Sequence, residues 1–450
     1  MKTTHTPSIV ILVDCKTRDL PQAALIAHQL EGMGVKAHLE PLEAYRGVLG
    51  AYRPDLILFN HLTASHLAEY SRRLAKMGVL TAVLPNEGIM YDPDDLRYSA
   101  GKFHTDAHID LFFCWNETHR QALRETSFGA DMRIEVVGVP RFDLYFQPWS
   151  HLCKRPQVTP RQRPRLLLCT NFVTAKFAEL PRVEGDKFFA AWKDRIQLYH
   201  DYWSAIEAHH RGRARIPDFL RALLADGRFD VTLRSHPRED SRFYKDVLAA
   251  LPTEQRNRVE LDSGSNITEL ILDCDLEISV ENCLTALESW IAGKPSLEIL
   301  LEQHPLWHMA EPAVCGLPCA RPENLPAMCA QALEAAPPAE LTAKRQAHLR
   351  KWCNMPDGRS SERVAQVIAN ALATKKAADW TQLNVQDHRR AMKLKLFRSL
   401  GLAYHYDPFM PLKRILFGDR HAIKDYAYRK SILPADVAKY SARIKNLSVS

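Results

Sequence analysis

Short apolar runs that alternate with helical stretches are the feature that most constrains the fold of this chain. Runs typical of buried strands occur at residues 9–13, 55–60, 79–84, 109–115, 133–137 and 165–170, and again within 229–234, 276–280 and 296–299. The stretches between them have helical character; residues 21–33, for example, begin with Pro and are followed by Gly34. Strands separated by helices form parallel sheets that helices cover on both faces. The sequence therefore predicts an α/β fold.

A proline-rich stretch divides this alternation into two parts. Four prolines fall between residues 148 and 164, where no apolar periodicity is present. The sequence predicts an N-terminal Rossmann-like domain (residues 1–147), a linker (148–164), a second Rossmann-like domain (165–374) and a C-terminal tail (375–450). Two doubly wound domains that face each other leave a cleft, which is a common place for a ligand. No G-x-G-x-x-G motif follows the first apolar run, which argues against an ordinary dinucleotide site.

The positive charge of the chain is concentrated in its tail. Residues 388–450 hold fourteen Lys and Arg against four Asp and Glu, a balance of +10, so the rest of the chain has −3 of the total +7. Apolar and basic residues are mixed at 392–400 and again at 409–417. These segments either pack on the body with solvated basic groups or attach peripherally to an anionic membrane surface. Nucleic acid is disfavoured as a partner because the body is acidic and has no recognisable nucleic-acid module.

Several features predict a cytoplasmic protein without a metal. The first residues lead directly into the strand at 9–13, and no apolar run approaches the roughly 18–20 residues of a membrane span. The ten cysteines are scattered singly, as in a reducing compartment. His104, Asp106 and His108 have a metal-like spacing, but no further ligand pattern supports them and polar loop residues are the favoured interpretation.

The stretch from Phe229 to Ile299 has the strongest indication of a binding site. A strand ends in Arg234, His236, Pro237 and Arg238, and two arginines beside a histidine suit a phosphate or carboxylate. A second strand runs through Ser279, Asn282 and Thr285 into a helix. The first amides of such a helix favour an anion. Glu288, one turn further, could accept from ribose hydroxyls, although an N-capped amphipathic helix explains the same pattern.

Polar residues also follow the strands of the first domain. Glu87 lies beside Gly at the end of an apolar strand, where a carboxylate can act as a general base or as a covalent nucleophile. The alternative is an ordinary turn residue. Other residues at the strand ends could line the same edge and meet an acceptor or the anionic part of a donor: Lys16, Arg18, Asp19, Asn60 and His61.

Together these residues resemble a known family. The pattern S-x-E-N-x-L-T-A-L-E-x-W-x-x-G-K-P, followed by a strand and preceded by the H-P loop, resembles GT-B glycosyltransferases over roughly residues 8–373. The segments V-D-C-K-T-R-D-L-P, F-N-H-L-T-A-S, L-P-N-E-G, F-F-C-W-N, G-V-P-R-F-D and R-S-H-P-R-E-D are similar to bacterial surface carbohydrate biosynthesis proteins. Those proteins are similar in turn to the capsule and O-antigen Kdo transferases.

This resemblance implies a GT-B fold and a transfer reaction with a nucleotide-activated sugar, CMP-Kdo, for surface polysaccharide or lipopolysaccharide. His236, Pro237, Ser279, Asn282 and Thr285 match the family's nucleotide-binding positions, and Glu87 matches its acidic residue proposed to attack the anomeric carbon. The acceptor would be a saccharide or a lipid-linked saccharide, and no metal would be required. Two alternatives remain open. One is a UDP-sugar transferase or an enzyme like UDP-sugar 2-epimerase, and the other is a non-catalytic polysaccharide assembly protein.

Overall fold

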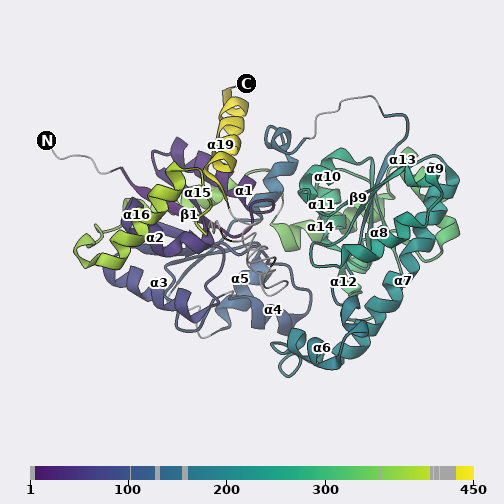
Figure 1. Cartoon of the computed structure of the whole chain (residues 1–450), viewed down its shortest axis with the longest axis horizontal. Coiled ribbons are helices and arrows are strands. Elements are labelled where there is room, and N and C mark those ends of the chain that lie inside the picture. The colour runs from purple at the N-terminus through teal and green to yellow at the C-terminus, as the bar shows by residue number, and fades with distance from the viewer. Residues whose placement is uncertain are drawn as a thin grey trace. The chain divides into compact units, whose positions relative to one another are not determined.

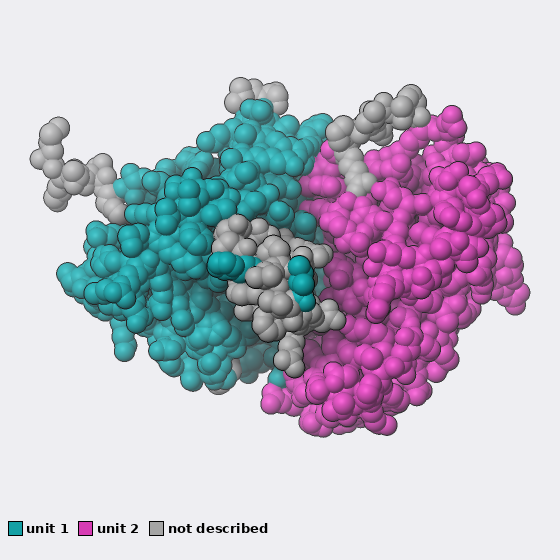
Figure 2. All heavy atoms as spheres, in the orientation of Figure 1, with its two compact units in different colours: residues 1–89, 97–152, 351–450 teal, residues 90–96, 153–350 magenta. Residues whose placement is uncertain are grey.

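The computed structural model forms two compact units, shown in separate colours in Figure 2. It describes residues 6–101, 103–126, 132–154, 161–354, 356–405, 409, 415 and 432–449. Unit 1 contains Met1–Ile89, Arg97–Leu152 and Lys351–Ser450, and unit 2 contains Met90–Leu96 and Cys153–Arg350. The division into two α/β units agrees with the sequence-based expectation.

Unit 1 is built on a six-stranded parallel sheet with the order β2-β1-β3-β4-β5-β6. Its strands are β1 (Ser8–Val13), β2 (Lys36–Pro41), β3 (Leu56–Phe59), β4 (Leu80–Val83), β5 (Leu111–Cys114) and β6 (Arg133–Val136). Five of these six strands match the apolar runs of the sequence. The edge strand β2 was missed because Lys36, His38 and Glu40 interrupt its apolar residues.

Helices surround this sheet in Figure 1. They include α1 (Leu20–Gly32), α2 (Tyr45–Tyr52), α3 (Ser65–Met77), α5 (Glu117–Arg124), α15 (Ser360–Ala373), α16 (Val385–Ser399) and α19 (Pro434–Val449). Helix α4 (Pro93–Ser99) is divided between the two units. From the C-terminal part of the chain, α15 and α19 pack against α1, and α16 packs along α2. None of the described helices combines the length and the apolar character that a bilayer span requires.

Unit 2 has a second parallel sheet with the order β12-β11-β10-β7-β8-β9. Its strands are β7 (Arg165–Cys169), β8 (Asp230–Arg234), β9 (Val259–Asp262), β10 (Leu276–Val280), β11 (Ser296–Ile299) and β12 (Pro318–Cys319). The central strands β7, β8 and β10 supply buried Leu, Ile and Val side chains to one hydrophobic core. Both units are therefore Rossmann-like, as the sequence predicts.

The helices of unit 2 differ from the sequence-based expectation between residues 187 and 225. They include α6 (Arg182–Phe189), α7 (Tyr202–Asp226), α8 (Ser241–Ala249), α9 (Thr253–Arg256), α10 (Ile267–Asp273), α11 (Leu284–Ile291), α12 (Ala310–Ala313), α13 (Leu325–Glu334) and α14 (Ala339–Cys353). The sequence predicts one helix at 187–210 and another at 217–225, but α6 ends at Phe189, and α7 begins at Tyr202 and continues through Pro217. Ile216, Phe219 and Leu220 are buried in the core around this proline. Their burial outweighs the roughly 3 kcal/mol that an interior proline costs a helix.

The C-terminal part of the chain returns to unit 1 earlier than the expected boundary after residue 374. The buried carboxylate of Asp143 accepts hydrogen bonds from the Ser360 amide at 2.9 Å and the Ser361 amide at 2.6 Å. Burial raises the pKa of Asp143 to about 6, against the lowering effect of these amides. This contact fixes the first turn of α15 to unit 1. Residues 155–160 of the expected linker lie outside the described residues.

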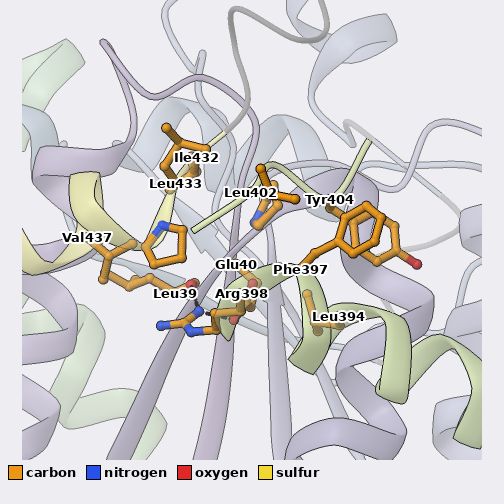
Figure 3. Close-up of a pocket in the computed structure, with 12 residues that line it drawn as sticks. Leu39, Glu40, Leu394, Phe397, Arg398, Leu402, Tyr404, Ile432, Leu433 and Val437 are labelled. Carbon is orange, nitrogen blue, oxygen red and sulfur yellow. Dashed lines mark hydrogen bonds and ion pairs between the residues drawn. The ribbon is translucent and has the colours of Figure 1, made fainter. Parts of the chain in front are cut away.

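The described part of the tail packs on unit 1 through one face of α16. Figure 3 shows Leu394, Phe397 and Arg398 beside Leu39 and Glu40 at the end of β2, where Arg398 forms an ion pair with Glu40. The expectation that the tail packs on the body is met for this face. Most of the second apolar and basic segment, 409–417, lies outside the described residues.

Candidate functional site

The carboxyl ends of three neighbouring strands form the candidate site in unit 2. Strands β10, β7 and β8 are adjacent and parallel, so the loops that follow them lie at one edge of the sheet. An open pocket lies at this edge. The side chains that line it include Asn171, Phe172, His209, Asn282, Trp307 and Met309. Only Asn282 among them was predicted from the sequence.

The loop after β8 is held in place by a glutamate that sequence analysis missed. Glu239 accepts hydrogen bonds from the His236 amide at 3.1 Å, from Thr170 Oγ1 at 2.9 Å and from Tyr244 Oη at 2.6 Å. His236 Nδ1 accepts from the Arg238 amide at 3.1 Å, so the proton of the neutral ring lies on Nε2. Burial raises the pKa of Glu239. The His-x-x-Glu spacing is the sequence feature from which this fixed loop could have been predicted.

The two arginines of this loop have different surroundings. Arg234 is buried, and its guanidinium donates to the backbone oxygen of Asp262 at 3.2 Å and of Ser265 at 3.0 Å. It therefore secures the loop after β9. Arg238 and Pro237 are exposed, and the Arg238 guanidinium lies 5.3 Å from the centre of the Phe188 ring. Of the two cations expected to meet a phosphate, Arg238 has the accessible position.

The turn between β10 and α11 has an unusual backbone. Glu281 and Asn282 have φ angles of 44° and 58°, in the left-handed region that favours glycine. Such residues cost on the order of 1–3 kcal/mol each and persist where surrounding contacts fix them. Strained turns of this kind are concentrated at functional sites. The sequence does not indicate this conformation at Glu281, although Asn adopts it more readily than most residues.

Two buried carboxylates fix this turn. Glu298 Oε1 accepts from the amide of Asn282 at 2.8 Å and from its Nδ2 at 3.0 Å. Glu281 Oε1 accepts from the amides of Glu302 at 2.5 Å and Gln303 at 3.1 Å. The turn and the loop after β11 therefore form one connected assembly at the edge of the sheet.

The helix that follows this turn begins where the sequence predicts. Its start was expected near residues 281–285, and α11 starts at Leu284, without a side-chain hydrogen bond at its N-cap. Ser279 Oγ donates to the Leu297 backbone oxygen at 3.3 Å, and Thr285 Oγ1 donates to Glu277 Oε1 at 2.6 Å. Glu288 is buried on the same helix. Four residues of this stretch were predicted to bind the nucleotide sugar, and among them Asn282 alone lines the pocket described above.

An aromatic stack forms one wall of the pocket. The rings of His209 and Trp307 are nearly parallel, with centroids 3.8 Å apart, and Phe172 meets His209 edge-on at 5.5 Å. Thr174 Oγ1 lies 2.7 Å from His209 Nδ1. Burial lowers the pKa of His209 to about 3, so the ring is neutral at physiological pH. Ring faces of this kind suit a base or a sugar face. The pairing of His209 with Trp307 could not be predicted because the two residues are far apart in the sequence.

The carboxyl group of Glu277, on β10, should make the stability of the protein depend on pH in an unusual way. Its side chain is fully buried, and burial raises its pKa to about 8. Between its ordinary pKa of 4.5 and 8 the folded protein holds a proton that the unfolded chain has released, so stability falls as pH rises. Relative to Glu277→Gln, the wild type should lose on the order of 2 kcal/mol between about pH 6 and pH 8. Urea unfolding at both pH values measures this difference.

A matched control is available on the surface of the same unit. Glu260 is exposed on β9, so Glu260→Gln should follow the wild type at each pH. Parallel curves for wild type and Glu277→Gln would contradict the assignment of a buried, protonated carboxyl to Glu277.

In unit 1, Glu87 lies in a well-fixed turn after β4. Trp115 Nε1 donates to the Pro85 backbone oxygen at 2.9 Å, and Asn116 Nδ2 donates to that of Gly88 at 3.2 Å. A Cβ at Gly88 would lie 2.8 Å from the Trp115 ring, so the close approach requires glycine. The Glu87 side chain is exposed at the carboxyl edge of the sheet.

The predicted residues after β1 lie at the same edge of unit 1. Buried Asp19 accepts from Arg18 Nε at 2.7 Å, from the Cys15 amide at 3.1 Å and from Asn86 Nδ2 at 3.3 Å. Burial raises the pKa of Asp19, and Arg18 opposes that shift. Asp19 therefore joins the loop after β1 to the turn that contains Glu87. Lys16 has another role, because its amino group pairs with Asp436 of α19 at 3.4 Å.

Asn60 and His61 follow β3, between β1 and β4 in the sheet. Asn60 is 6% exposed, and neither its amide nitrogen nor its oxygen has a hydrogen-bond partner within the described part of the chain. Buried polar atoms normally have partners, so this amide is suited to receive a ligand. His61 Nδ1 lies 3.2 Å from Thr63 Oγ1.

The histidines at this metal-like spacing in the first domain lie beside nearby carboxylates. His104 Nδ1 lies 4.0 Å from Asp106, and His108 Nε2 lies 3.2 Å from Asp110. Across the residues that the structure describes, no group of three or more His, Cys, Asp or Glu side chains is placed to hold a metal ion. The side chains at 104–108 therefore behave as polar loop residues.

Comparisons with known proteins give a fold but no family. No family model matches the chain. No curated protein sequence matches it. Among solved structures, one assigned as a UDP-N-acetylglucosamine 2-epimerase of Listeria monocytogenes aligns over 83% of this chain and 99% of its own, with a TM-score of 0.51 and 10% identity.

Two further structures align less closely. The Neisseria meningitidis UDP-GlcNAc 2-epimerase bound to UDP-GlcNAc covers 81% of this chain and 100% of its own, at 10% identity and a TM-score of 0.45. A glycosyltransferase of Rickettsia africae ESF-5 covers 83% and 100%, at 12% identity and a TM-score of 0.41. The Listeria alignment and the two parallel sheets confirm the expected fold, two Rossmann-like domains of the GT-B type.

Proposed function

We propose that the protein is a sugar-transferring enzyme that uses a nucleotide-activated sugar and holds the nucleotide at the carboxyl edge of the unit 2 sheet. The observation that carries this proposal is the fixed, left-handed turn at Glu281 and Asn282, which lines a pocket beside an aromatic wall.

The proposal gives each part of the unit 2 site a role. Asn282, the first amides of α11, His236 and exposed Arg238 meet the phosphate groups. The stacked rings of His209 and Trp307 provide a flat apolar wall. Ser279, Thr285 and Glu288 support the turn and helix from beneath, in contrast to the direct ligand contacts expected from the sequence. Arg234 and Pro237 maintain the loops after β9 and β8.

Glu87 of unit 1 is the proposed catalytic residue. Its exposed carboxylate attacks the anomeric carbon, or removes the proton of the acceptor hydroxyl as that oxygen attacks. In either case the bond from the sugar to the nucleotide phosphate breaks, and the phosphate leaves with the bonding electrons. Cations and helix amides at the nucleotide site stabilise this charge, so a required metal is not part of the proposal. Arg18, Asp19, Asn60 and His61 are proposed to meet the acceptor, whereas Lys16 holds α19.

A uridine diphosphate sugar is the first choice of donor. The structure with the TM-score of 0.51 is assigned to an enzyme of UDP-N-acetylglucosamine, and both epimerase-like and transferase chemistry fit this choice. CMP-Kdo is the second candidate, because the N-E-G turn around Glu87 and the H-P loop resemble the Kdo transferases. In that case the product would be a surface polysaccharide or lipopolysaccharide, and the acceptor a saccharide or a lipid-linked saccharide.

A thermal-shift panel with UDP, CMP, GDP and ADP tests this proposal. A ligand at a hundredfold excess over its dissociation constant stabilises the folded protein by about 2.7 kcal/mol. We expect stabilisation by UDP that is lost in His236→Ala and retained in His200→Ala, a change at an exposed histidine of the same unit. Selective stabilisation by CMP would favour CMP-Kdo, and no response to any nucleotide would contradict the proposed function.

A further inference from the structure

The outer face of α16 concentrates the exposed apolar side chains of this protein. Among the described residues, eleven large hydrophobic side chains are exposed, and six of them fall within residues 385–415. Four of those six belong to α16 and its C-cap: Val385 (66% exposed), Met392 (68%), Leu396 (52%) and Leu400 (61%). Their spacing of seven, four and four residues places them on one side of the helix. We call this set the α16 stripe.

Basic side chains flank the stripe on both sides. Arg389, Lys393 and Lys395 are exposed, and the helical spacing puts Lys395 on one side of Met392 and the other two on the opposite side. The Lys393 amino group lies 4.5 Å from the centre of the Tyr404 ring. The helix has a single acidic residue, Asp387, which is buried. The exposed surface of α16 therefore combines apolar and cationic groups without a carboxylate.

The opposite face of α16 fixes the orientation of the stripe. Asp387 accepts from Arg73 Nη1 of α3 at 2.9 Å, and it also closes a capping box with Asn384. A Cβ at Gly50 of α2 would lie 2.9 Å from the Asp387 backbone oxygen, which shows how closely the two helices approach. Leu394 is buried beside the Arg398–Glu40 ion pair (Figure 3). These contacts keep the helix from turning its exposed apolar side chains inward.

We propose that the α16 stripe docks unit 1 on an anionic lipid surface, with α16 lying in the plane of the headgroups. A narrow apolar stripe suits shallow insertion between lipids, while the flanking cations meet lipid phosphates. Charge selects this occupant over a second copy of the chain, because a paired copy would bring the same cations into contact. The inference goes beyond the proposed reaction, since it concerns where the enzyme works.

Co-sedimentation of the full chain with phosphatidylcholine vesicles, with and without phosphatidylglycerol, tests this surface. Wild type should bind only the anionic vesicles, and high salt should weaken binding. The triple variant Met392→Glu, Leu396→Glu, Leu400→Glu should lose binding about tenfold or more, as should Arg389→Gln with Lys395→Gln. The matched control is Leu180→Glu with Val183→Glu, which changes side chains of similar exposure in unit 2 (45% and 50%) and should bind as wild type does.

Three results would overturn the proposal. They are binding that survives the apolar variant, equal loss in the unit 2 control, and a concentration-dependent dimer that the apolar variant dissociates. Because the changed residues are exposed, thermal unfolding and nucleotide binding should match those of wild type in every variant. Those two measurements separate failure of the docking surface from failure of the proposed enzyme activity.

Discussion

Replacement of Glu87 by Gln should slow turnover of the nucleotide sugar by about 10²- to 10⁴-fold, the usual contribution of a positioned acid, base or nucleophile. The amide keeps the size of the side chain and its place in the turn, but it lacks the charge needed to attack carbon or accept a proton. Since Glu87 is exposed, stability should change by less than about 0.5 kcal/mol. The rate to measure is release of nucleotide from sugar donors that contain the nucleotide identified by the thermal-shift panel.

Glu69→Gln provides the matched control for this experiment. Glu69 is also an exposed glutamate of unit 1, but it lies on α3. Its replacement should leave both turnover and nucleotide binding unchanged. If Glu87→Gln retains turnover within about threefold of wild type, Glu87 has no catalytic role.

Glu298→Ala should have the second-largest effect, on stability and on binding together. The change leaves the Asn282 amide and its Nδ2 without their acceptor and opens a cavity at a side chain that is 6% exposed. We expect a loss of about 2–4 kcal/mol in the free energy of unfolding. Relaxation of the left-handed turn should weaken nucleotide binding about tenfold or more, because its strain is of order 1–3 kcal/mol per residue. Urea unfolding and calorimetric titration with UDP measure the two effects.

Two variants show whether the turn is responsible. Glu298→Gln keeps an oxygen acceptor for Asn282 and should preserve most of the binding. Glu302→Ala, in the loop after β11, removes an ion pair with Arg211, whose side chain is 57% exposed, and should cost less than about 1 kcal/mol. Equal losses of affinity in Glu298→Ala and Glu302→Ala would show that the turn at Asn282 has no special role.

The sheets could be predicted from the sequence because their central strands are continuous apolar runs. Ile9–Val13 and the strand around Val231 show that pattern clearly, and the structure buries both. Strand β2 was hidden because it is an edge strand with alternating polar residues. The course of α7 through Pro217 was hidden because the burial that supports it comes from distant strands.

The sequence predicts where the candidate site lies better than it predicts which contacts the side chains of the site make. His236 and Asn282 follow strands and could be found from local pattern alone. The direction of the Thr285 and Ser279 side chains depends on Glu277 and on the Leu297 backbone, which a linear pattern does not reveal. Likewise, the pairing of His209 with Trp307 joins residues far apart in the sequence. No periodicity records such contacts, because they arise from the packing of separate elements.

Hydrogen–deuterium exchange with and without UDP or CMP tests the central claim most directly, because it locates the nucleotide on the chain. We predict that one of these nucleotides slows amide exchange in the turn and helix start at 280–286 and in the loop at 235–239. Both segments lie at the carboxyl edge of the unit 2 sheet. Protection confined to other segments, or unchanged exchange at saturating concentrations of both nucleotides, would contradict the assignment of this edge as the nucleotide site.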